Sequence, residues 1–258
     1  MMASLRARAL PGLPELRAGD DLARLIAEAA PREEPLCDGQ LVVIAHKAVS
    51  KCEGAVVALA GVRASERARE LAAEAAAAGQ ERDPRAIQVV LDESAEIVRA
   101  ERGVLVCRTR HGFVCANAGV DASNSADRDT LVLLPRDPDG SARAIRARLR
   151  ELTGAGVAVL VSDSFGRAWR HGQLDVAIGL AGMQPLDDWR GRSDSAGMQL
   201  RATWLAVADA AAGAAELVRA KDSREPVVIV DGLARYFTDE DGPGAVALLR
   251  ALEEDMFR

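Results

Sequence analysis

The sequence predicts an α+β fold, a mixed α/β chain in which mixed sheets are flanked by helices. Short apolar runs such as Leu41–Ala45 and residues 157–162 are typical of buried strands. Longer Ala- and Glu-rich segments such as residues 63–78 favour helices. Two strand-like runs, residues 104–108 and 113–116, lie on either side of a short polar turn and predict a hairpin. A hairpin argues against a purely parallel sheet, so we expect a mixed one.

Start and stop signals place the remaining elements. Asp20 or Asp21 can cap the first helix, Pro84 suits the first turn of another, and Ser141 and Gly154 can cap and close a third. In chain order, the predicted elements are helix 21–30, strand 41–45, strand 55–59, helix 63–78, helix 84–99, strands 104–108 and 113–116, helix 141–152, strand 157–162, helix 202–219, strand 226–230 and helix 243–257.

Length and charge narrow the class of protein. The chain has 258 residues, which we interpret as a single domain spanning residues 1–258, with two intertwined subdomains as a further option. It carries 33 basic and 39 acidic residues, a net charge of −6, and only 3% aromatic residues. An acidic chain with few aromatics is a poor binder of nucleic acid. We therefore expect small-molecule partners and no nucleic acid.

Compartment signals favour the cytoplasm. No apolar run approaches the roughly 18 to 20 residues that cross a bilayer, and no apolar region of a signal peptide follows Arg6 and Arg8. We expect neither membrane association nor secretion. The four cysteines lack CxxC or metal-knuckle spacing and are expected to be reduced and structural; they are Cys37, Cys52, Cys107 and Cys115.

Standard catalytic motifs are missing from the sequence. There is no GxxxxGK[ST] phosphate loop, no HExxH and no GxSxG. Residues 242–247 fit a loose GxGxxA, but they lack a preceding buried strand and a downstream acidic residue, so a turn that opens the last helix is the better interpretation. The three histidines, His46, His111 and His171, form no spaced metal set.

Polar side chains instead concentrate in three stretches, 46–54, 108–124 and 162–173. The first follows a buried strand and carries two of the three lysines of the chain, Lys47 and Lys51, which could hold phosphate oxygens. The second contains Asp121 among small residues, and the third begins with Asp163 directly after an apolar strand. Carboxylates on separate strand ends suit Mg²⁺ or Mn²⁺. Solvated strand ends and plain turns remain alternatives for each stretch.

These stretches resemble the coenzyme F420-0:L-glutamate ligases, also called F420-0:γ-glutamyl ligases. The resemblance covers residues 12 to about 233. The matching blocks, in the family's order, are Gly12-Leu13-Pro14 with Gly19-Asp20-Asp21-Leu22, Val49-Ser50-Lys51-Cys52-Glu53-Gly54, residues 110–124, residues 137–142, Asp163-Ser164-Phe165-Gly166-Arg167, Asp188-Trp189-Arg190-Gly191-Arg192 and Ala206-Val207-Ala208-Asp209.

The resemblance implies a reaction. Members of this family add L-glutamate to the lactyl-phosphate side of the deazaflavin F420-0, and then further γ-linked glutamates, using GTP with Mg²⁺ or Mn²⁺. GTP phosphorylates the acceptor carboxylate, and the amine of glutamate then displaces phosphate from the acyl phosphate. The resemblance further implies a homodimer and a family-specific fold that is neither P-loop nor ATP-grasp. K⁺ is a further candidate cofactor.

The resemblance also implies site residues. The metal positions are Asp121, Asp163 and Ser164, and no covalent catalytic residue is expected. The nucleotide positions are Gly12, Leu13, Pro14, Glu15, His46, Lys47, Lys51, Asn124, Arg219, Lys221, Asp222, Ser223 and Arg224. Arg190 and Arg192 are candidates for holding substrate carboxylates, with surface ion pairing as the alternative.

Several positions depart from the family, and two of these departures bear on function. Lys221 stands where some members carry a carboxylate metal ligand, and since an ammonium cannot ligate a metal, we expect Lys221 to replace the charge of a second ion or to contact phosphate. No C-terminal reductase-like domain follows, as it does in some relatives, so we expect a short or differently controlled glutamate tail. Two alternatives stay open: a ligase of the same fold that acts on another carboxylate, and a non-catalytic nucleotide-binding homologue.

Overall fold

A five-stranded mixed sheet forms the centre of the protein. The structure is a computed structural model and describes residues 4–122, 129–220 and 222–255. The strands are β1 (Arg6–Ala9), β2 (Leu41–Ala45), β8 (Ala158–Arg167), β9 (Arg170–Ala181) and β12 (Val227–Asp231). Their order is β1-β12-β2-β8-β9; β2 and β8 run parallel, and the other neighbours are antiparallel. The predicted mixed α+β fold is confirmed.

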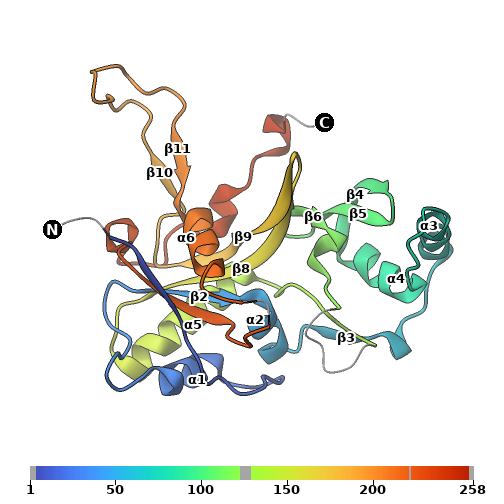
Figure 1. The fold of residues 1–258 in the computed structure, drawn as a ribbon, viewed down its shortest axis with the longest axis horizontal. Helices are drawn as coiled ribbons and strands as arrows, with labels where there is room; N and C mark the ends of the chain where they lie inside the picture. The colour runs from blue at the N-terminus through green and yellow to red at the C-terminus, as the bar shows by residue number, and fades with distance from the viewer. Residues whose placement is uncertain (1–3, 123–128, 221, 256–258) are drawn as a thin grey trace.

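Helices cover both faces of this sheet (Figure 1). On one face lie α1 (Leu22–Ala29), α2 (His46–Cys52) and α5 (Pro138–Thr153), and on the other lies α6 (Val207–Glu216). Successive strand residues point to opposite faces, so Val42 and Val159 join the first core while Leu41 and Leu160 join the second. Because both faces are buried, the central strands are continuously apolar, as the sequence indicated.

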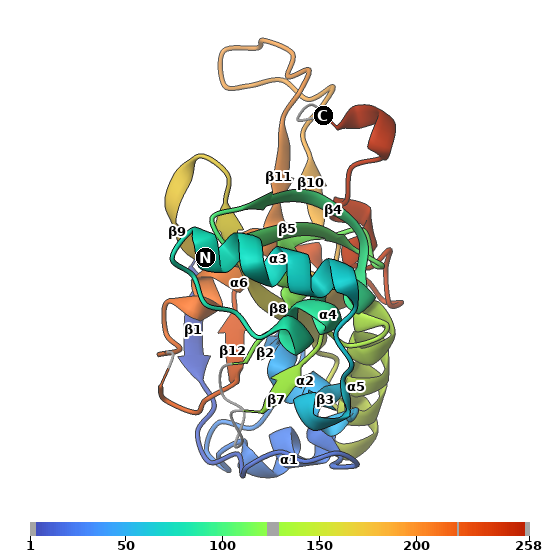
Figure 2. The same ribbon diagram turned by 90° about the vertical axis from the view of Figure 1, so that its right-hand side faces the viewer.

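A smaller part with its own core lies beside the central sheet (Figure 2). It contains α3 (Glu66–Ala77), α4 (Pro84–Glu93) and the three-stranded sheet β4 (Ser94–Glu101), β5 (Val104–Thr109) and β6 (Val114–Ala116). Strands β3 (Val56–Ala58) and β7 (Thr130–Val132) form a two-stranded sheet. A second pair, β10 (Leu186–Asp188) and β11 (Trp204–Ala206), forms the base of an arm that projects from the body (Figure 1). Over the described residues, no helix is long and apolar enough to cross a bilayer.

Several predicted element boundaries are wrong for identifiable reasons. The helix from Pro84 ends at Glu93 rather than near residue 99, because the next residues pair with β5. The helix expected from Ser141 begins three residues earlier, where the Asp137 carboxylate accepts a hydrogen bond from the Gly140 N–H. The helix expected over 202–219 shortens to α6, since β11 precedes it and pairs with β10.

Two further corrections concern whole elements. Strand β9 was not predicted, because its exposed start carries polar residues that are typical of a loop. The closing helix expected over 243–257 is absent from the described residues up to 255, where the chain forms short 3₁₀ turns instead. The N–H groups of Ala245 and Val246 donate to the carboxylate of Asp139, so they are bonded to a side chain of α5.

A β-bulge marks the transition from the apolar to the polar half of the central hairpin. Val161 of β8 lies opposite Gly179, but Ser162 lies opposite Ala177, so Ile178 is the extra residue on β9. Bulges bend a strand locally and are common beside functional sites. This one lies directly before the Asp163-Ser164 pair.

The bulge is held by Asp209, which yields a pH-dependent prediction. Its Oδ1 accepts a hydrogen bond from the Ala177 N–H at 2.9 Å. Burial raises the pKa of Asp209 above its ordinary value of 3.8, although the Ala177 hydrogen bond acts in the opposite direction. The folded protein therefore binds this proton more tightly than the unfolded chain does, and the resulting contribution to stability is present below pH 3.8 and lost as the pH rises through the folded-state pKa.

We therefore expect Asp209→Asn to raise the free energy of unfolding at pH 7. The amide oxygen can still accept from Ala177, while the buried charge is removed. Urea unfolding at a series of pH values should show this gain shrinking as the pH falls toward 3.8. The same change at the exposed Asp239 should give no such gain, and a less stable Asp209→Asn protein at pH 7 would contradict the account.

A left-handed turn precedes the candidate metal residue Asp121. Asn117, Ala118 and Gly119 have φ values of 52°, 53° and 73°, a region that non-glycine residues rarely adopt. The Arg82 guanidinium donates to Asn117 Oδ1 at 2.9 Å and helps to hold the turn. Strained backbone of this kind persists where the surroundings fix it.

Replacing Gly119 with alanine tests how tightly this turn is packed. A Cβ there would lie 2.7 Å from Leu134 Cγ, whereas at Gly154, with nearly the same φ, it would meet nothing within 4 Å. We expect Gly154→Ala to cost about 1–2 kcal/mol for the backbone conformation alone, and Gly119→Ala to cost about 1–3 kcal/mol more for crowding. Chemical denaturation measures both, and equal losses would contradict the packing argument.

Candidate functional site

The site begins where β2 ends beside the middle of β8. Ala45, the last residue of β2, lies opposite Ser162 of β8, so the next residues, His46 and Asp163, are neighbours. The strand predicted to end at residue 162 continues to Arg167, because it pairs with β9. His46 Nε2 lies 3.2 Å from Asp163 Oδ1, and the imidazole is buried. Asp163 Oδ1 also accepts a hydrogen bond from the Ser164 N–H at 2.8 Å.

Asp121 approaches the same place from the smaller part of the molecule. Its backbone is fixed by two hydrogen bonds with Val132 of β7, at 3.0 and 2.8 Å. Its Oδ2 lies 2.6 Å from Lys47 Nζ. Since Lys47 follows His46 on α2, two consecutive residues contact the two candidate metal carboxylates. Asp121 and Asp163 are 42 positions apart in the sequence. Both of them contact the first turn of α2.

The negative charge of Asp163 also reaches Cys115 of β6. Burial, with the charge of Asp163 as the second cause, raises the pKa of the Cys115 thiol to about 12. The thiol is therefore neutral at physiological pH. This agrees with the structural role expected for the cysteines, and the described cysteines are free thiols.

The last turn of α2 carries a second polar contact. Lys51 Nζ lies 2.6 Å from Oε1 of Glu15, which follows the turn at Gly12. The Lys51 hydrogen bond holds the pKa of Glu15 below its ordinary value against a smaller effect of burial, and the charges of Arg224 and Arg17 act with it. The structure thus brings together three of the predicted nucleotide residues, Glu15, Lys51 and Arg224.

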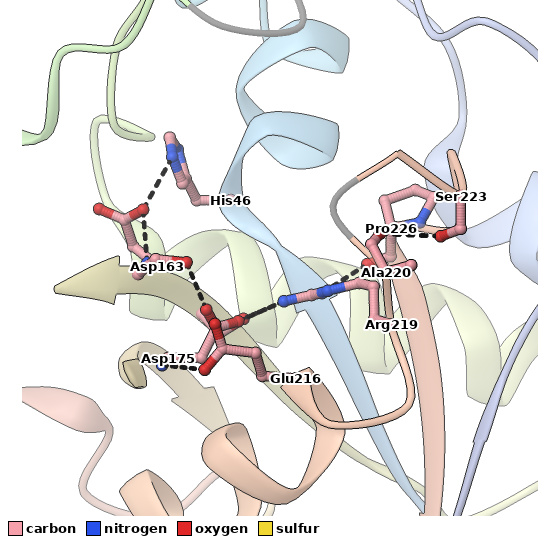
Figure 3. Close-up of polar contacts among 10 residues, drawn as sticks. His46, Asp163, Asp175, Glu216, Arg219, Ala220, Ser223 and Pro226 are labelled. Atoms are coloured by element: carbon pink, nitrogen blue, oxygen red, sulfur yellow. Dashed lines mark hydrogen bonds and ion pairs between the residues drawn. The ribbon is translucent and has the colours of Figure 1, made fainter. Parts of the chain in front are cut away.

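A third group of contacts lies on the other face of β8 (Figure 3). Ser164 Oγ donates to Asp175 Oδ1 at 2.5 Å, and Ser162 Oγ donates to Asp175 Oδ2 at 2.9 Å. The guanidinium of Arg219 pairs with Asp175, which is 1% exposed. The Asp175 N–H donates to Glu216 Oε2 at 2.9 Å. Because side chains alternate along a strand, Ser164 points away from the His46 side, toward which Asp163 points.

The loop after α6 contains other predicted nucleotide residues. Arg219 Nη1 donates to the Pro226 carbonyl at 3.1 Å, and Ser223 Oγ donates to the Ala220 carbonyl at 3.0 Å (Figure 3). Asp222 is exposed. The predicted residues Lys221 and Asn124 lie outside the described residues.

The donor atoms at the site fit a hard divalent cation. Asp121 and Asp163 offer carboxylate oxygens, which Mg²⁺ and Mn²⁺ prefer. The third predicted metal residue, Ser164, lies on the other face of β8, where its hydroxyl donates to Asp175. Among the described residues, no group of three or more His, Cys, Asp or Glu side chains forms a metal-binding cluster. A cation held by one or two carboxylates takes its other ligands from water and substrate phosphates, as Mg²⁺ commonly does.

The two arginines expected to hold substrate carboxylates lie on the projecting arm. Arg190 forms a two-pronged ion pair with Asp188, with its Nε and Nη2 at 3.0 and 2.7 Å from the carboxylate oxygens, and stacks 3.9 Å over Trp204. Arg192 lies 3.6 Å from an oxygen of Asp187. Both arginines therefore pair with aspartates of the arm itself. This matches surface ion pairing, the alternative to a role in holding substrate carboxylates.

Sequence reasoning missed the role of two acidic residues beside Ser164. Asp175 lies two residues beyond the third polar stretch, and Glu216 lies outside all three stretches. The signal was available: Asp175 is the one charged residue in the run from Leu174 to Ala181. A charged side chain in a buried strand needs an oppositely charged or hydrogen-bonding partner. If β9 had been recognised as a strand, such a partner for Asp175 would have been expected.

The fold and the site together define a class. The protein is an α+β protein without a P-loop motif, in which carboxylates suited to a divalent cation and a lysine suited to phosphate meet at the start of α2. Comparison with known sequences identifies the family: the profile described as "F420-0:Gamma-glutamyl ligase" matches residues 12–232. The chain therefore belongs to the F420-0:γ-glutamyl ligase family.

Relatives named coenzyme F420:L-glutamate ligase match nearly the whole chain. The protein from Methanothermobacter thermautotrophicus is 43% identical over 249 residues, which cover 96% of both chains. The one from Methanopyrus kandleri is 43% identical over 257 residues, 99% of this chain and 98% of the relative. The one from Halobacterium salinarum is 42% identical over 256 residues, 98% and 96% of the two chains.

Proposed function

We propose that this protein is a GTP- and divalent-metal-dependent ligase that adds L-glutamate to coenzyme F420-0 through an acyl phosphate. The observation that carries the proposal is the contact of consecutive residues, His46 and Lys47, with the two carboxylates Asp163 and Asp121. Family membership and the names of relatives that match over nearly the full length support the same conclusion.

The chemistry requires two negative groups to meet. A carboxylate and a triphosphate repel each other, so positive charge must screen them before the carboxylate oxygen can attack phosphorus. A divalent cation, when bound, supplies part of this charge and polarises the phosphate. Asp121 and Asp163 would hold that cation, while Lys47 and Lys51 would supply ammonium groups to the phosphates.

The proposed reaction has two displacements. In the first, an oxygen of the F420-0 carboxylate attacks the γ-phosphorus of GTP, and GDP leaves. In the second, the amine of glutamate attacks the acyl carbon, and inorganic phosphate leaves, with release of one proton overall. Neither step needs a covalent bond to the protein, so the site residues act by positioning and by charge.

Isotope transfer tests the acyl phosphate directly. F420-0 labelled with ¹⁸O in its lactyl carboxylate is incubated with GTP, L-glutamate and Mn²⁺, and the inorganic phosphate is analysed by mass spectrometry. We expect one ¹⁸O atom in each phosphate released, because the oxygen that attacks phosphorus leaves with it. Product formation with unlabelled phosphate would contradict this mechanism.

Substrate specificity is tested in the same assay. ATP replaces GTP in one series, and folate or pterin carboxylates replace F420-0 in another. We expect glutamyl transfer with GTP and F420-0 and little with the others. Equal turnover of a folate acceptor would favour a ligase of the same fold that acts on another carboxylate. Three further predictions stand beside this proposal: the protein forms a homodimer, uses K⁺ as an additional cofactor and is located in the cytoplasm.

A further inference from the structure

The imidazole of His46 is buried, and one of its nitrogens lacks a hydrogen bond. The side chain lies between Asp163 and Ser50 and is 2% exposed. Nε2 is 3.2 Å from Asp163 Oδ1 (Figure 3). Across the described residues, however, Nε2 has no hydrogen-bond partner, so the two atoms are close but lack the direction that a hydrogen bond requires. A buried polar atom in this state is costly unless another group binds it.

The other ring nitrogen explains how Nε2 can act as a ligand. Nδ1 lies 3.4 Å from Oγ of Ser50, which is fully buried one turn later on α2. When the single hydrogen of the neutral ring is on Nδ1 and is donated to Ser50, Nε2 carries a lone pair. This lone pair and the Asp163 carboxylate repel each other unless a cation is bound between them. Histidines that bind metals typically donate their other ring N–H in this way.

The distance between the two atoms suits neighbouring ligands of one metal ion. Ligands that lie about 2.1 Å from an octahedral ion, at right angles to each other, are about 3.0 Å apart, close to the 3.2 Å between His46 Nε2 and Asp163 Oδ1. Such ligands point at the ion and not at each other, which accounts for the missing hydrogen bond. Oδ1 also accepts a hydrogen bond from the Ser164 N–H at 2.8 Å, and its second lone pair can face a cation.

Burial separates His46 from the nucleotide role that the family resemblance implies. A side chain that is 2% exposed has almost no surface with which to contact a nucleotide. The two lysines of the same helix differ in this respect, because the side chains of Lys47 and Lys51 are 21% and 19% exposed. The lysines therefore keep their proposed role toward phosphate, and His46 needs a different one.

We propose that His46 is a ligand of the divalent cation, through Nε2 and beside Asp163. This inference rests on the proposed function, because it adds a ligand to the cation that the ligase reaction requires. Imidazole nitrogen suits transition metals better than it suits Mg²⁺, which prefers oxygen. The nitrogen ligand therefore shifts the preference of the site from Mg²⁺ toward Mn²⁺ and Co²⁺.

Nitrogen hyperfine coupling detects a histidine ligand without any substitution. The protein is prepared with ¹⁵N in its histidines only, loaded with Mn²⁺ in the presence and absence of unlabelled GTP, and studied by electron–nuclear double resonance. We expect the ¹⁵N coupling of a nitrogen bonded directly to Mn²⁺. The guanine nitrogens of GTP cannot give this signal, because they carry no label. Bound Mn²⁺ without ¹⁵N coupling would overturn the inference and leave the proposed function standing.

His46→Gln distinguishes a metal ligand from a hydrogen-bond partner of Asp163. Glutamine keeps an N–H for the carboxylate and an oxygen suited to Mg²⁺, but it has no nitrogen lone pair. We expect the ¹⁵N coupling to disappear and Mn²⁺ and Co²⁺ to bind about 10- to 100-fold more weakly, with Mg²⁺ affinity within about threefold of the parent. The control is His171→Gln, at an exposed position of β9, which should keep the coupling and all three affinities.

The melting temperatures of the metal-free proteins show whether each variant is folded. Parent-like Co²⁺ affinity in a folded His46→Gln protein, or a ¹⁵N coupling that survives this change, would overturn the inference alone. If His46→Gln fails to fold, the coupling is measured in His111→Gln and His171→Gln; its persistence in both assigns it to His46, the remaining histidine of the chain, and its loss in either overturns the inference. A parent protein that binds neither Mn²⁺ nor GTP would overturn the proposed function and the inference with it.

Discussion

Asp121→Asn is expected to lower kcat for glutamyl transfer by roughly 10²- to 10³-fold, about 3–4 kcal/mol in the transition state. The amide is isosteric but carries no charge, so it weakens the hold on a divalent cation and leaves Lys47, 2.6 Å away, without its carboxylate partner. Steady-state turnover of F420-0 with GTP and saturating Mn²⁺ measures the loss.

Asp241→Asn is the matched control for this experiment. Asp241 and Asp121 have side chains 44% and 39% exposed, and each forms a close ion pair, with Arg146 at 2.8 Å and with Lys47 at 2.6 Å. Asp241 pairs with Arg146, whose Nε donates to the Val157 carbonyl, six residues before Asp163 on the chain. We expect this control to retain near-parent turnover. Parent-like turnover in Asp121→Asn would show that the metal assignment is wrong.

Lys51→Met is expected to raise the Kd for GTP about 10- to 100-fold, or roughly 1.4–2.8 kcal/mol. Its ammonium is the charged group at the end of α2 and faces the Gly12–Glu15 segment expected to contact the nucleotide. Charge-assisted bonds to phosphate have about this strength. Isothermal titration calorimetry with GTP in the presence of Mg²⁺ measures the change.

Glu15→Gln distinguishes the two roles that Lys51 could have. If Lys51 served only to hold the Gly12 segment through its 2.6 Å contact with Glu15, removing the acidic partner would weaken GTP binding as much as Lys51→Met. We expect instead that Glu15→Gln stays within a few-fold of the parent, because the lysine charge remains. Equal losses in the two variants would assign Lys51 a purely structural role.

The apolar cores of the central strands were predictable because local patterns determine them. Residues 41–45 and 157–161 are apolar without interruption, and polar residues follow each run. His46 and Asp163 meet because β2 and β8 pair in parallel, with Ala45 opposite Ser162, and a single sequence does not reveal this pairing. The approach of Asp121 depends on pairing with Val132, which a single sequence does not reveal.

Two of the failed predictions arise because contacts with other segments override the local pattern. The closing segment 243–257 has helical composition, but Asp139, more than a hundred residues earlier, binds the N–H groups at its start. Strand β9 begins with exposed polar residues that mimic a loop, and only its pairing with β8 makes it a strand. Local propensity is overridden where such tertiary contacts form.

The central claim is tested most directly by identifying the product. The purified protein is incubated with F420-0, GTP, L-glutamate and Mn²⁺, beside the Asp121→Asn and Asp241→Asn variants, and the products are read by mass spectrometry. We predict mass steps of one glutamyl unit with equimolar GDP for the parent and Asp241→Asn, and roughly 10²- to 10³-fold slower product formation for Asp121→Asn. Unchanged F420-0 in the parent reaction, with GTP bound but intact, would contradict the ligase assignment.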